Sequence, residues 1–573
     1  MINWSADKIT LYFRIVMNLF FQKHHRLLFY STWLILALVQ SASTELIADE
    51  AYYWVYSRFP DWGYFDHPPM IAILIRSGYT IFHNELGVRL ICALLSTLTI
   101  LIIEMLTERK NPLLFYSIVL SIGVLQIAGF LAVPDTPLLF FTAVFFYAYR
   151  RFIKKFSWQN SLLLGIAITL LFYTKYHGLL IVLFAFLSNI KLLGRWQTWL
   201  VGFFVLLLYS PHLLWQWHHD WVSFRYHLFE SNVSAYRFSY TIEYLLGQLL
   251  LAGPIAGFIL LPAAFMYKTK DETEKALKST LLGVYLIFLI SSFRGKVEVN
   301  WTMPALVPLI VLSHQFIIDK ISWVRPLRII AFISLLLIVA GRFYLVIDIG
   351  PDNSVKKRFH NNRVWAEAIT EKTKDIPVVF YNSYQRASLF WFYSGIQSHS
   401  HNPYWDRRSN YNFWPTESNL LGKTVFIADI YGIDSFSDSM NTKKGWIGYT
   451  KDTMYSALGA VMIFPNRDKI ITNTTGTYRF PCSRFIPPQY QYFLKMHPEL
   501  NVEILAGVFK GKELIKEVNT GVTLMDLRDK KYGFEATLDL SNISPGKYVL
   551  RFGIKSKNYL VTHNSGKIQL IVR

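Results

Sequence analysis

The residues best suited to chemistry lie in four short polar segments, each beside an apolar run. The first segment carries two adjacent carboxylates, Asp49 and Glu50, and about 17 residues later a third, Asp66, beside His67. The other three place ionisable groups among prolines or aromatic residues, at 133–137, 174–178 and 294–301. A carboxylate that reaches a reacting hydroxyl acts as a general base, which is typically worth about 10²–10⁴-fold in rate. Because charged groups beside lipid usually face a cavity or a partner, we expect the four segments to share one polar cavity.

Each segment also has a simpler interpretation. Acidic and aromatic residues at the end of a span are often interfacial anchors, and an aspartate between prolines, such as Asp135, is often a helix cap. Lys175 alternatively extends its ammonium to the membrane surface. Asp66 and His67 pair a carboxylate with an imidazole, a set that suits a divalent ion such as Mg, Mn or Zn, although the sequence indicates no further ligand. These alternatives stay open for each segment taken alone.

Apolar runs must position these segments. The chain has 573 residues, of which 53% are hydrophobic and 17% charged, whereas a soluble protein carries about 25% charged residues. A helix needs roughly 20 apolar residues to cross a bilayer. Such runs, some of them short, are predicted at 27–44, 86–106, 112–132, 136–149, 159–174, 177–190, 198–216, 242–266, 279–293, 302–318 and 327–347. We therefore expect a polytopic α-helical membrane protein with about 11 transmembrane helices.

Clusters of lysine and arginine set the expected orientation. The N-terminal stretch and the loops after even-numbered runs are basic, for example at 150–155 and 268–278. The positive-inside rule assigns short basic loops to the cytoplasm, so the four polar segments and the chain after residue 347 are expected outside. The net charge of +20 then reflects membrane topology, and nucleic acid is not an expected partner.

The sequence after residue 347 has no long apolar run and has the composition of a soluble region, which we expect to be extracytoplasmic. The predicted domains are a transmembrane domain at 1–347, an α/β region at 348–485 and a β-rich, sandwich-like module at 486–573. In the α/β region a helix is predicted at 365–373 and strands at 378–381 and 424–427; in the β-rich module strands are predicted at 502–508, 533–538 and 548–554. Two cysteines, Cys92 and Cys482, are too few for a disulfide framework or a cysteine-based metal site.

Two stretches of the first outward loop carry a resemblance to a known family. Residues 49–54 read Asp-Glu-Ala-Tyr-Tyr-Trp, and residues 63–69 read Gly-Tyr-Phe-Asp-His-Pro-Pro. Together they resemble the first-loop signature of membrane glycosyltransferases of the C-type fold, and within it the family of protein O-mannosyltransferases and bacterial aminoarabinose transferases of lipid A. Weaker similarities to that family lie at 134–137, 296–301, 384–388 and 407–411.

The chain also departs from the family pattern. The lipid A transferases carry Glu-Lys before their Pro-Pro pair, where this chain has Asp66 and His67. The protein mannosyltransferases usually carry a luminal domain inserted between spans, and no loop here is large enough for one. These departures leave the donor sugar and the acceptor open. The missing inserted domain favours a bacterial inner membrane, in which the outward C-terminal domain is periplasmic.

The resemblance implies transfer of a sugar from a polyprenyl-phosphate-linked donor to a hydroxyl or phosphate of a lipid, glycan or protein acceptor. The transition state has oxocarbenium character, by analogy with glycoside hydrolysis. It requires a base, for which Asp49 is the first candidate and Glu50 the second, and cations that stabilise the departing phosphate, with Lys296 as first candidate. The expected donor-phosphate and substrate-binding residues are Asp66, His67, Asp135, Lys175, Tyr176, His177, Arg294, Lys296, Glu298, Asn300, Trp301, Arg386, Arg407 and Arg408.

The main alternative is a lipid or glycolipid transporter or flippase. Secondary transporters place ionisable groups near the bilayer midplane and often show internal repeats, whereas here the charges gather at one expected surface and no duplication is visible. A flippase with an aromatic, basic outer cavity is harder to separate from a transferase. An adjacent Asp-Glu pair at the first outward boundary favours the transferase.

Overall fold

The structure is a computed structural model that describes residues 6–573 apart from 231–234, 432, 473–476 and 529–532. It divides into two compact units: a membrane unit formed by residues 1–44 and 56–351, and a C-terminal unit formed by 45–55 and 352–573. Helix α2 (Ala48–Arg58) contributes its first residues to the C-terminal unit and its last residues to the membrane unit. The three predicted domains stay a prediction; the short segment 45–55 is the part of the N-terminal region that packs with the C-terminal unit.

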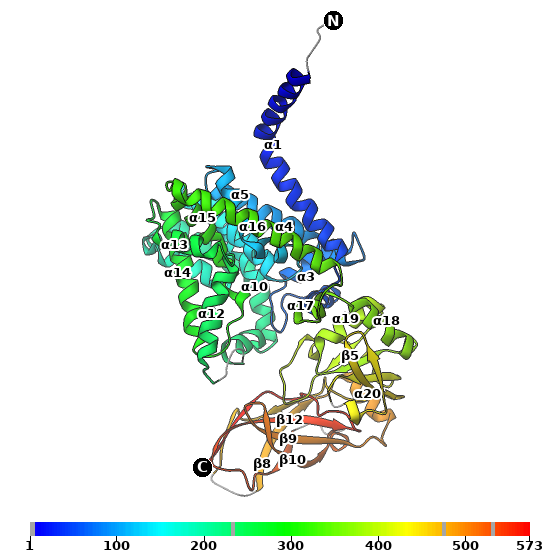
Figure 1. Ribbon diagram of the computed structural model, residues 1–573. Coiled ribbons are helices and arrows are strands. Elements are labelled where there is room, and N and C mark those ends of the chain that lie inside the picture. The colour runs from blue at the N-terminus through cyan, green and yellow to red at the C-terminus, as the bar shows by residue number, and fades with distance from the viewer. Residues whose placement is uncertain (1–5, 231–234, 432, 473–476, 529–532) are drawn as a thin grey trace. The chain divides into compact units, whose positions relative to one another are not determined.

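The described residues of the membrane unit form helices joined by turns and loops, with no strand (blue to green in Figure 1). Its α-helices are α1 (Ala6–Ser43), α3 (Met70–Tyr79), α4 (Glu85–Leu106), α5 (Pro112–Ser121), α6 (Gly123–Ile127), α7 (Asp135–Lys154), α8 (Trp158–Thr174), α9 (Gly178–Leu187), α10 (Trp196–His218), α11 (Val222–Arg225), α12 (Phe238–Leu251), α13 (Gly257–Met266), α14 (Glu272–Ser292), α15 (Leu306–Ile317) and α16 (Ile321–Val346). Shorter helical turns are η1 (Ala128–Phe130), η2 (Ile190–Gly194), η3 (Tyr226–Glu230) and η4 (Val299–Ala305).

Helices occupy all of the predicted apolar runs, and some runs are broken. Among the described residues, four helices are long and apolar enough to cross a membrane, or up to six if each of two bent helix pairs forms one span. The run at 242–266 is interrupted between α12 and α13, where Gly253 has a φ of +100° and Pro254 follows it. Proline cannot donate a helical hydrogen bond, and glycine accepts a positive φ without strain. The count of about eleven spans stays a prediction.

The helix ends follow from local sequence. Asn84 accepts from the backbone N–H of Gly87 at the start of α4, at 3.2 Å, and Ser157 accepts from Asn160 at the start of α8, at 3.3 Å. Such side chains satisfy N–H groups that have no partner inside the helix. Helix α7 packs against α4, α8 and α14, and its buried residues belong to the main apolar core of the membrane unit. The first residue of α7 is Asp135, so this packing places one of the predicted site residues.

The first part of the C-terminal unit is a small α/β region. A five-stranded sheet with the order β2-β1-β3-β5-β4 pairs β1 in parallel with β2 and β3, and β5 antiparallel with β3 and β4. The strands are β1 (Val378–Tyr381), β2 (His399–His401), β3 (Val425–Asp429), β4 (Asp438–Thr442) and β5 (Gly445–Asp452). The accompanying helices are α17 (Ser354–Phe359), α18 (Asn362–Thr373), α19 (Tyr384–Ser394), η5 (Asn410–Asn412) and η6 (Ile433–Ser435). The predicted helix at 365–373 and the strands near 378 and 425 are confirmed.

The second part is a sandwich of two β-sheets. One sheet has the order β10-β9-β12-β13-β7 and the other β11-β8-β6, and their buried faces share one apolar core (Figure 1). The elements are β6 (Met462–Pro465), β7 (Lys469–Thr472), β8 (Thr477–Phe485), α20 (Pro488–Met496), β9 (Val502–Lys510), β10 (Glu513–Thr523), α21 (Leu524–Arg528), β11 (Phe534–Asp539), β12 (Gly546–Ser556) and β13 (Ile568–Val572). Alternating burial along β11 follows the alternation in its sequence, because successive side chains in a strand point to opposite faces. Cys92 and Cys482 are both buried and unbridged.

Candidate active site

A buried ion pair forms the centre of the site in the membrane unit. The Nζ of Lys175 donates to Oδ1 of Asp135 at 2.8 Å, and both side chains are more than 90% buried. The amide of Asn300 donates to the other carboxylate oxygen, Oδ2, at 2.9 Å. The three residues come from the start of α7, the end of α8 and the start of η4. The structure therefore joins three of the four predicted segments through one carboxylate.

The first polar segment contributes Asp66 and His67 to the same region. The hydroxyl of Tyr56 donates to Oδ1 of Asp66, which is 8% exposed. Burial lowers the pKa of His67 to about 4; the charge of Asp66 opposes this shift, and the charge of Lys175 adds to it. His67 is therefore a neutral imidazole at pH 7, able to accept or donate a hydrogen bond without carrying charge.

Aromatic residues extend the site on the side of α8 and α9. The ring of His177 stacks on Phe288 with a centroid distance of 5.3 Å and lies 5.7 Å from the ring of Trp301. The ring centroids of Tyr176 and His212 lie 5.9 Å apart, and the Nε2 of Gln216 donates to the hydroxyl of Tyr176 at 2.9 Å. Tyr176 and His177 directly follow Lys175 in sequence, Trp301 directly follows Asn300, and ring contacts hold all three.

The sequence did not predict the contribution of α10 and the turns that follow it. His212 and Gln216, one helical turn apart, are buried on α10, and Gln216 also donates to the hydroxyl of Ser223 at 2.8 Å. Ser223 in turn donates to the backbone oxygen of Tyr64 at 2.7 Å, and a ring nitrogen of His227 lies 2.9 Å from the backbone oxygen of Asp66. Polar residues four apart inside an apolar run were the available signal, since such residues share one helix face.

The cationic loop before η4 is exposed to solvent, in contrast to the buried ion pair. Arg294, Lys296 and Glu298 are exposed, and Lys296 pairs with Glu298 at 3.7 Å with both side chains 56% exposed. An exposed pair of this kind contributes little to stability, with a median near 0–1 kcal/mol. Arg294 and Lys296 therefore carry solvent-exposed charges, while Asn300, at the start of η4, is tied to the buried Asp135.

The predicted bases belong to the C-terminal unit. Asp49, in the first turn of α2, accepts from the side-chain amide of Gln385 at 3.0 Å, and Arg358 lies 3.8 Å from its other oxygen. Glu50 is fully buried and accepts from the backbone N–H of Ile47 at 3.1 Å. Of the two carboxylates, Asp49 is the one with access to solvent, since a third of its side chain is exposed.

The structure brings 49–54 together with the two similar stretches of the tail. The backbone N–H of Asn410 donates to the Tyr52 hydroxyl at 2.9 Å, and the ring of Tyr52 lies 4.4 Å from that of Tyr384. Arg407 donates to the Tyr384 hydroxyl at 2.8 Å and covers its ring at 5.1 Å. Residues more than 300 positions apart in sequence thus form one aromatic cluster.

Arg386 and Arg408, the other two arginines predicted in this unit, have different neighbours. Burial lowers the pKa of Arg386, and the charges of Tyr431 and Asp429 oppose this shift. The guanidinium of Arg408 donates to the ring nitrogen Nδ1 of His563 at 3.2 Å and to the backbone oxygen of Ser565 at 3.2 Å. Arg408 therefore contacts the β-sandwich, and its assignment to substrate binding stays a prediction.

Metal binding by Asp66 and His67 also stays a prediction. Across the described part of the chain, no group of three or more His, Cys, Asp or Glu side chains is arranged to hold a metal ion. Oδ1 of Asp66 already accepts a hydrogen bond from Tyr56.

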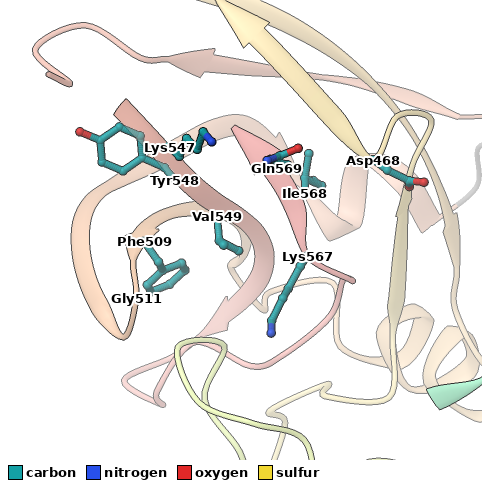
Figure 2. A pocket seen from close by; sticks show the side chains of 9 residues that line it. All are labelled: Asp468, Phe509, Gly511, Lys547, Tyr548, Val549, Lys567, Ile568 and Gln569. Carbon is teal, nitrogen blue, oxygen red and sulfur yellow. The ribbon is translucent and has the colours of Figure 1, made fainter. Parts of the chain in front are cut away.

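A separate hollow lies on the β-sandwich. It has a volume of about 350 Å³ and is formed around the starts of β12 and β13 and the end of β9, with Val549, Lys567 and Gln569 among its lining residues (Figure 2). None of the nine residues that line it is a predicted site residue. Hollow volume alone therefore does not identify the active site.

Three comparisons with known proteins agree on a family resemblance. A sequence profile of the family described as dolichyl-phosphate-mannose-protein mannosyltransferase matches residues 66–215. The lipid A galacturonosyltransferase RgtD of Rhizobium johnstonii is 25% identical over 317 residues, which are 52% of this chain and 66% of RgtD. The chain thus matches slightly less than two thirds of that relative.

Two solved structures of ArnT from Cupriavidus metallidurans have a similar fold. The apo structure superposes with a TM-score of 0.55, and the structure bound to undecaprenyl phosphate with a TM-score of 0.52. Each is 14% identical and covers 74% of this chain and 97% of ArnT. The comparisons confirm the predicted resemblance to polyprenyl-phosphate-sugar-dependent membrane glycosyltransferases of the C-type fold, and they show a multi-pass membrane protein with an ArnT-like fold. They do not favour the flippase alternative.

Proposed function

We propose that this chain, which has an ArnT-like fold, transfers a sugar from a polyprenyl-phosphate-linked donor to a lipid A-like glycolipid at the outer face of the membrane. The observation that carries the proposal is the buried set of Asp135, Lys175 and Asn300, with Asp66 and His67 beside it. All but Asn300 lie inside the segment 66–215 that matches the mannosyltransferase profile. A purely structural bundle has no need for so many ionisable groups in a dry interior, where each is costly.

Each step of the proposed reaction has its own candidate residues. In this proposal Asp49 takes the proton of the acceptor, as its partly exposed carboxylate permits. The departing phosphate gains charge as the glycosidic bond breaks, and cations stabilise that charge. Arg294 and Lys296 are suited to this because their charges are exposed rather than neutralised inside the protein.

Lys175 has a supporting role in this scheme. Its charge is already balanced by Asp135, so it contributes mainly by holding that carboxylate. Asp135 in turn holds Asn300, which lies on the loop that carries Arg294 and Lys296. The buried pair therefore positions the exposed cations, and the neutral His67 supplies a hydrogen bond but no charge.

Sugar transfer is tested with the purified full chain, lipid A and a panel of labelled polyprenyl-phosphate sugars. We expect the mass of lipid A to rise by one sugar residue, and Asp49→Asn to lower the rate by about 10²–10⁴-fold, the usual contribution of a general base. Asp375→Asn is the matched control, because Asp375 is exposed in the C-terminal unit and has a positive φ that Asn also accepts.

Two results would contradict the proposal in different ways. An unchanged rate for Asp49→Asn removes Asp49 from the mechanism while leaving the transferase intact. No product from any donor, together with movement of labelled lipid between the leaflets of a proteoliposome, replaces the transferase with a flippase.

A further inference from the structure

A polar pocket in the membrane unit is lined by residues that are not members of the candidate site. It has a volume of about 270 Å³ and is formed where the end of α2 meets the end of α3 and the turn that follows. Its lining residues are Ser57, Arg58, Arg76, Tyr79, Thr80 and His83. Two arginines, a histidine and three side-chain hydroxyls line it, and none of the six residues is acidic.

The chemistry of these side chains selects an anion with several oxygen atoms. Arginine presents five N–H donors in a planar fork that matches a phosphate or carboxylate. Arg76 makes one hydrogen bond within the described residues, from a terminal nitrogen to the backbone oxygen of Ser57 at 3.1 Å, so most of its donors are left for a ligand.

The backbone around the pocket is rigid. Gly78 and Gly87 allow α3 and α4 to approach closely: a Cβ at Gly78 would lie 2.2 Å from the backbone oxygen of Gly87, and one at Gly87 would lie 1.7 Å from that of Phe82. The N–H groups of Ile81 and Phe82 both donate to the oxygen of Gly78, at 3.0 and 3.2 Å. The turn that carries Thr80 and His83 is therefore fixed before any ligand binds, which lowers the entropic cost of binding.

Exposed apolar side chains lie directly beside this basic pocket. Ile81 is 60% exposed and Phe82 42%, both in the same turn as Thr80 and His83, and Ile73 on α3 is 51% exposed. A free phosphate makes no contact that needs exposed apolar side chains, whereas a lipid has apolar chains next to its charged headgroup. The pocket is smaller than the roughly 300–1,000 Å³ of sites that enclose a whole drug-sized ligand, so it suits a headgroup whose remainder lies outside.

We propose that this pocket binds the phosphate headgroup of a lipid, with Arg58 and Arg76 as the anion ligands and Ile81 and Phe82 against the lipid chains. The identification of that lipid with the glycolipid acceptor rests on the proposed function. A phosphate held here lies on the same unit as the buried Asp135–Lys175 pair, and it would anchor the acceptor independently of the residues that perform the transfer.

The test measures binding of fluorescent lipid A to the purified full chain, apart from any sugar transfer. We expect lipid A with its phosphates to bind at least tenfold more tightly than enzymatically dephosphorylated lipid A. The double variant Arg58→Gln/Arg76→Gln should remove this difference, and its Gln at position 76 still offers a donor to the oxygen of Ser57. Arg58→Lys/Arg76→Lys, which keeps the charge but loses the planar fork, should give an intermediate affinity.

Arg237→Gln is the matched control, since Arg237 is exposed, lies in the same unit and is expected on the same side of the membrane. It should retain the full preference for phosphorylated lipid A. Competition by millimolar inorganic phosphate alone, with no preference for the lipid, would replace the lipid headgroup with free phosphate and overturn the proposal. Wild-type affinity of either double variant for phosphorylated lipid A would also overturn it, whether or not the chain transfers a sugar.

Discussion

The ammonium of Lys175 lies 2.8 Å from a carboxylate oxygen of Asp135, with neither side chain more than 7% exposed. The two residues are 40 positions apart and end up together because α7 and α8 pack side by side with the start of one beside the end of the other. Inside a dry helical bundle, each charge is tolerable only in the presence of the other.

Breaking this pair should destabilise the protein more than removing both charges. Lys175→Met or Asp135→Leu leaves one buried charge without its partner, which typically costs about 3–5 kcal/mol. The double variant leaves neither charge, and we expect it to regain most of the thermal stability while losing sugar transfer. Thermal unfolding in detergent and the transfer assay measure the two effects separately.

The control for this cycle is Lys110→Met. Lys110 pairs with Glu108 at 2.7 Å, but the two side chains are 55% and 44% exposed, so its removal should leave the thermal stability close to that of the wild type. A double variant no more stable than the single ones would show that the ion pair is not the source of the coupling.

The C-terminal unit should lose stability on acidification. Burial lowers the pKa of His399 to about 3 and that of His401 to about 4, because the folded protein disfavours the charged imidazole. In the unfolded chain these histidines bind protons near pH 6.5, whereas in the folded protein they do so only at lower pH. The free energy of unfolding is therefore highest above pH 6.5, and it falls as the pH drops from 6.5 towards the pKa values of the folded protein. At pH 5 each histidine should cost about 2 kcal/mol relative to pH 7.

His401→Gln should reduce this pH dependence. A ring nitrogen of His401 lies 2.8 Å from the backbone oxygen of Leu560, and the amide of glutamine can donate to the same oxygen without titrating. His497→Gln is the control, because His497 lies at the surface beside Glu499. Hydrogen exchange of peptides from 399–401 and 554–562, measured between pH 5 and pH 7.5, follows the opening of this unit. Equal pH dependence in the wild type and His401→Gln would rule out His401 as a source.

The orientation predicted from the basic loops is tested by topology reporters. A periplasmic reporter fused after residue 350 should be active, and one fused within the basic loop at 150–155 should not be. Activity of the second fusion and not the first would invert the orientation, and with it the outer-face location proposed for sugar transfer.

Much of the local structure could be predicted from the sequence. Apolar runs form helices because the backbone N–H and C=O groups find no hydrogen-bond partners in lipid and must bond within the helix. Short alternating segments such as β11 and β12 form strands because one of their faces is buried. The chemistry of the candidate site was also visible as residue types, since Asp66, Asp135 and Lys175 lie in short polar segments beside apolar runs, where charge is costly.

Only the tertiary structure decided which of these residues meet. It joined Asn300 to Asp135 across 165 positions, brought in His212 and Gln216 from a helix that reads as an ordinary apolar span, and left Lys296 on an exposed loop. It also packed Asp49 against Gln385 in the C-terminal unit, 336 positions away. Periodicity reports which face of an element is buried, but the partner of that face depends on contacts between distant segments, which a single sequence does not encode in any local pattern.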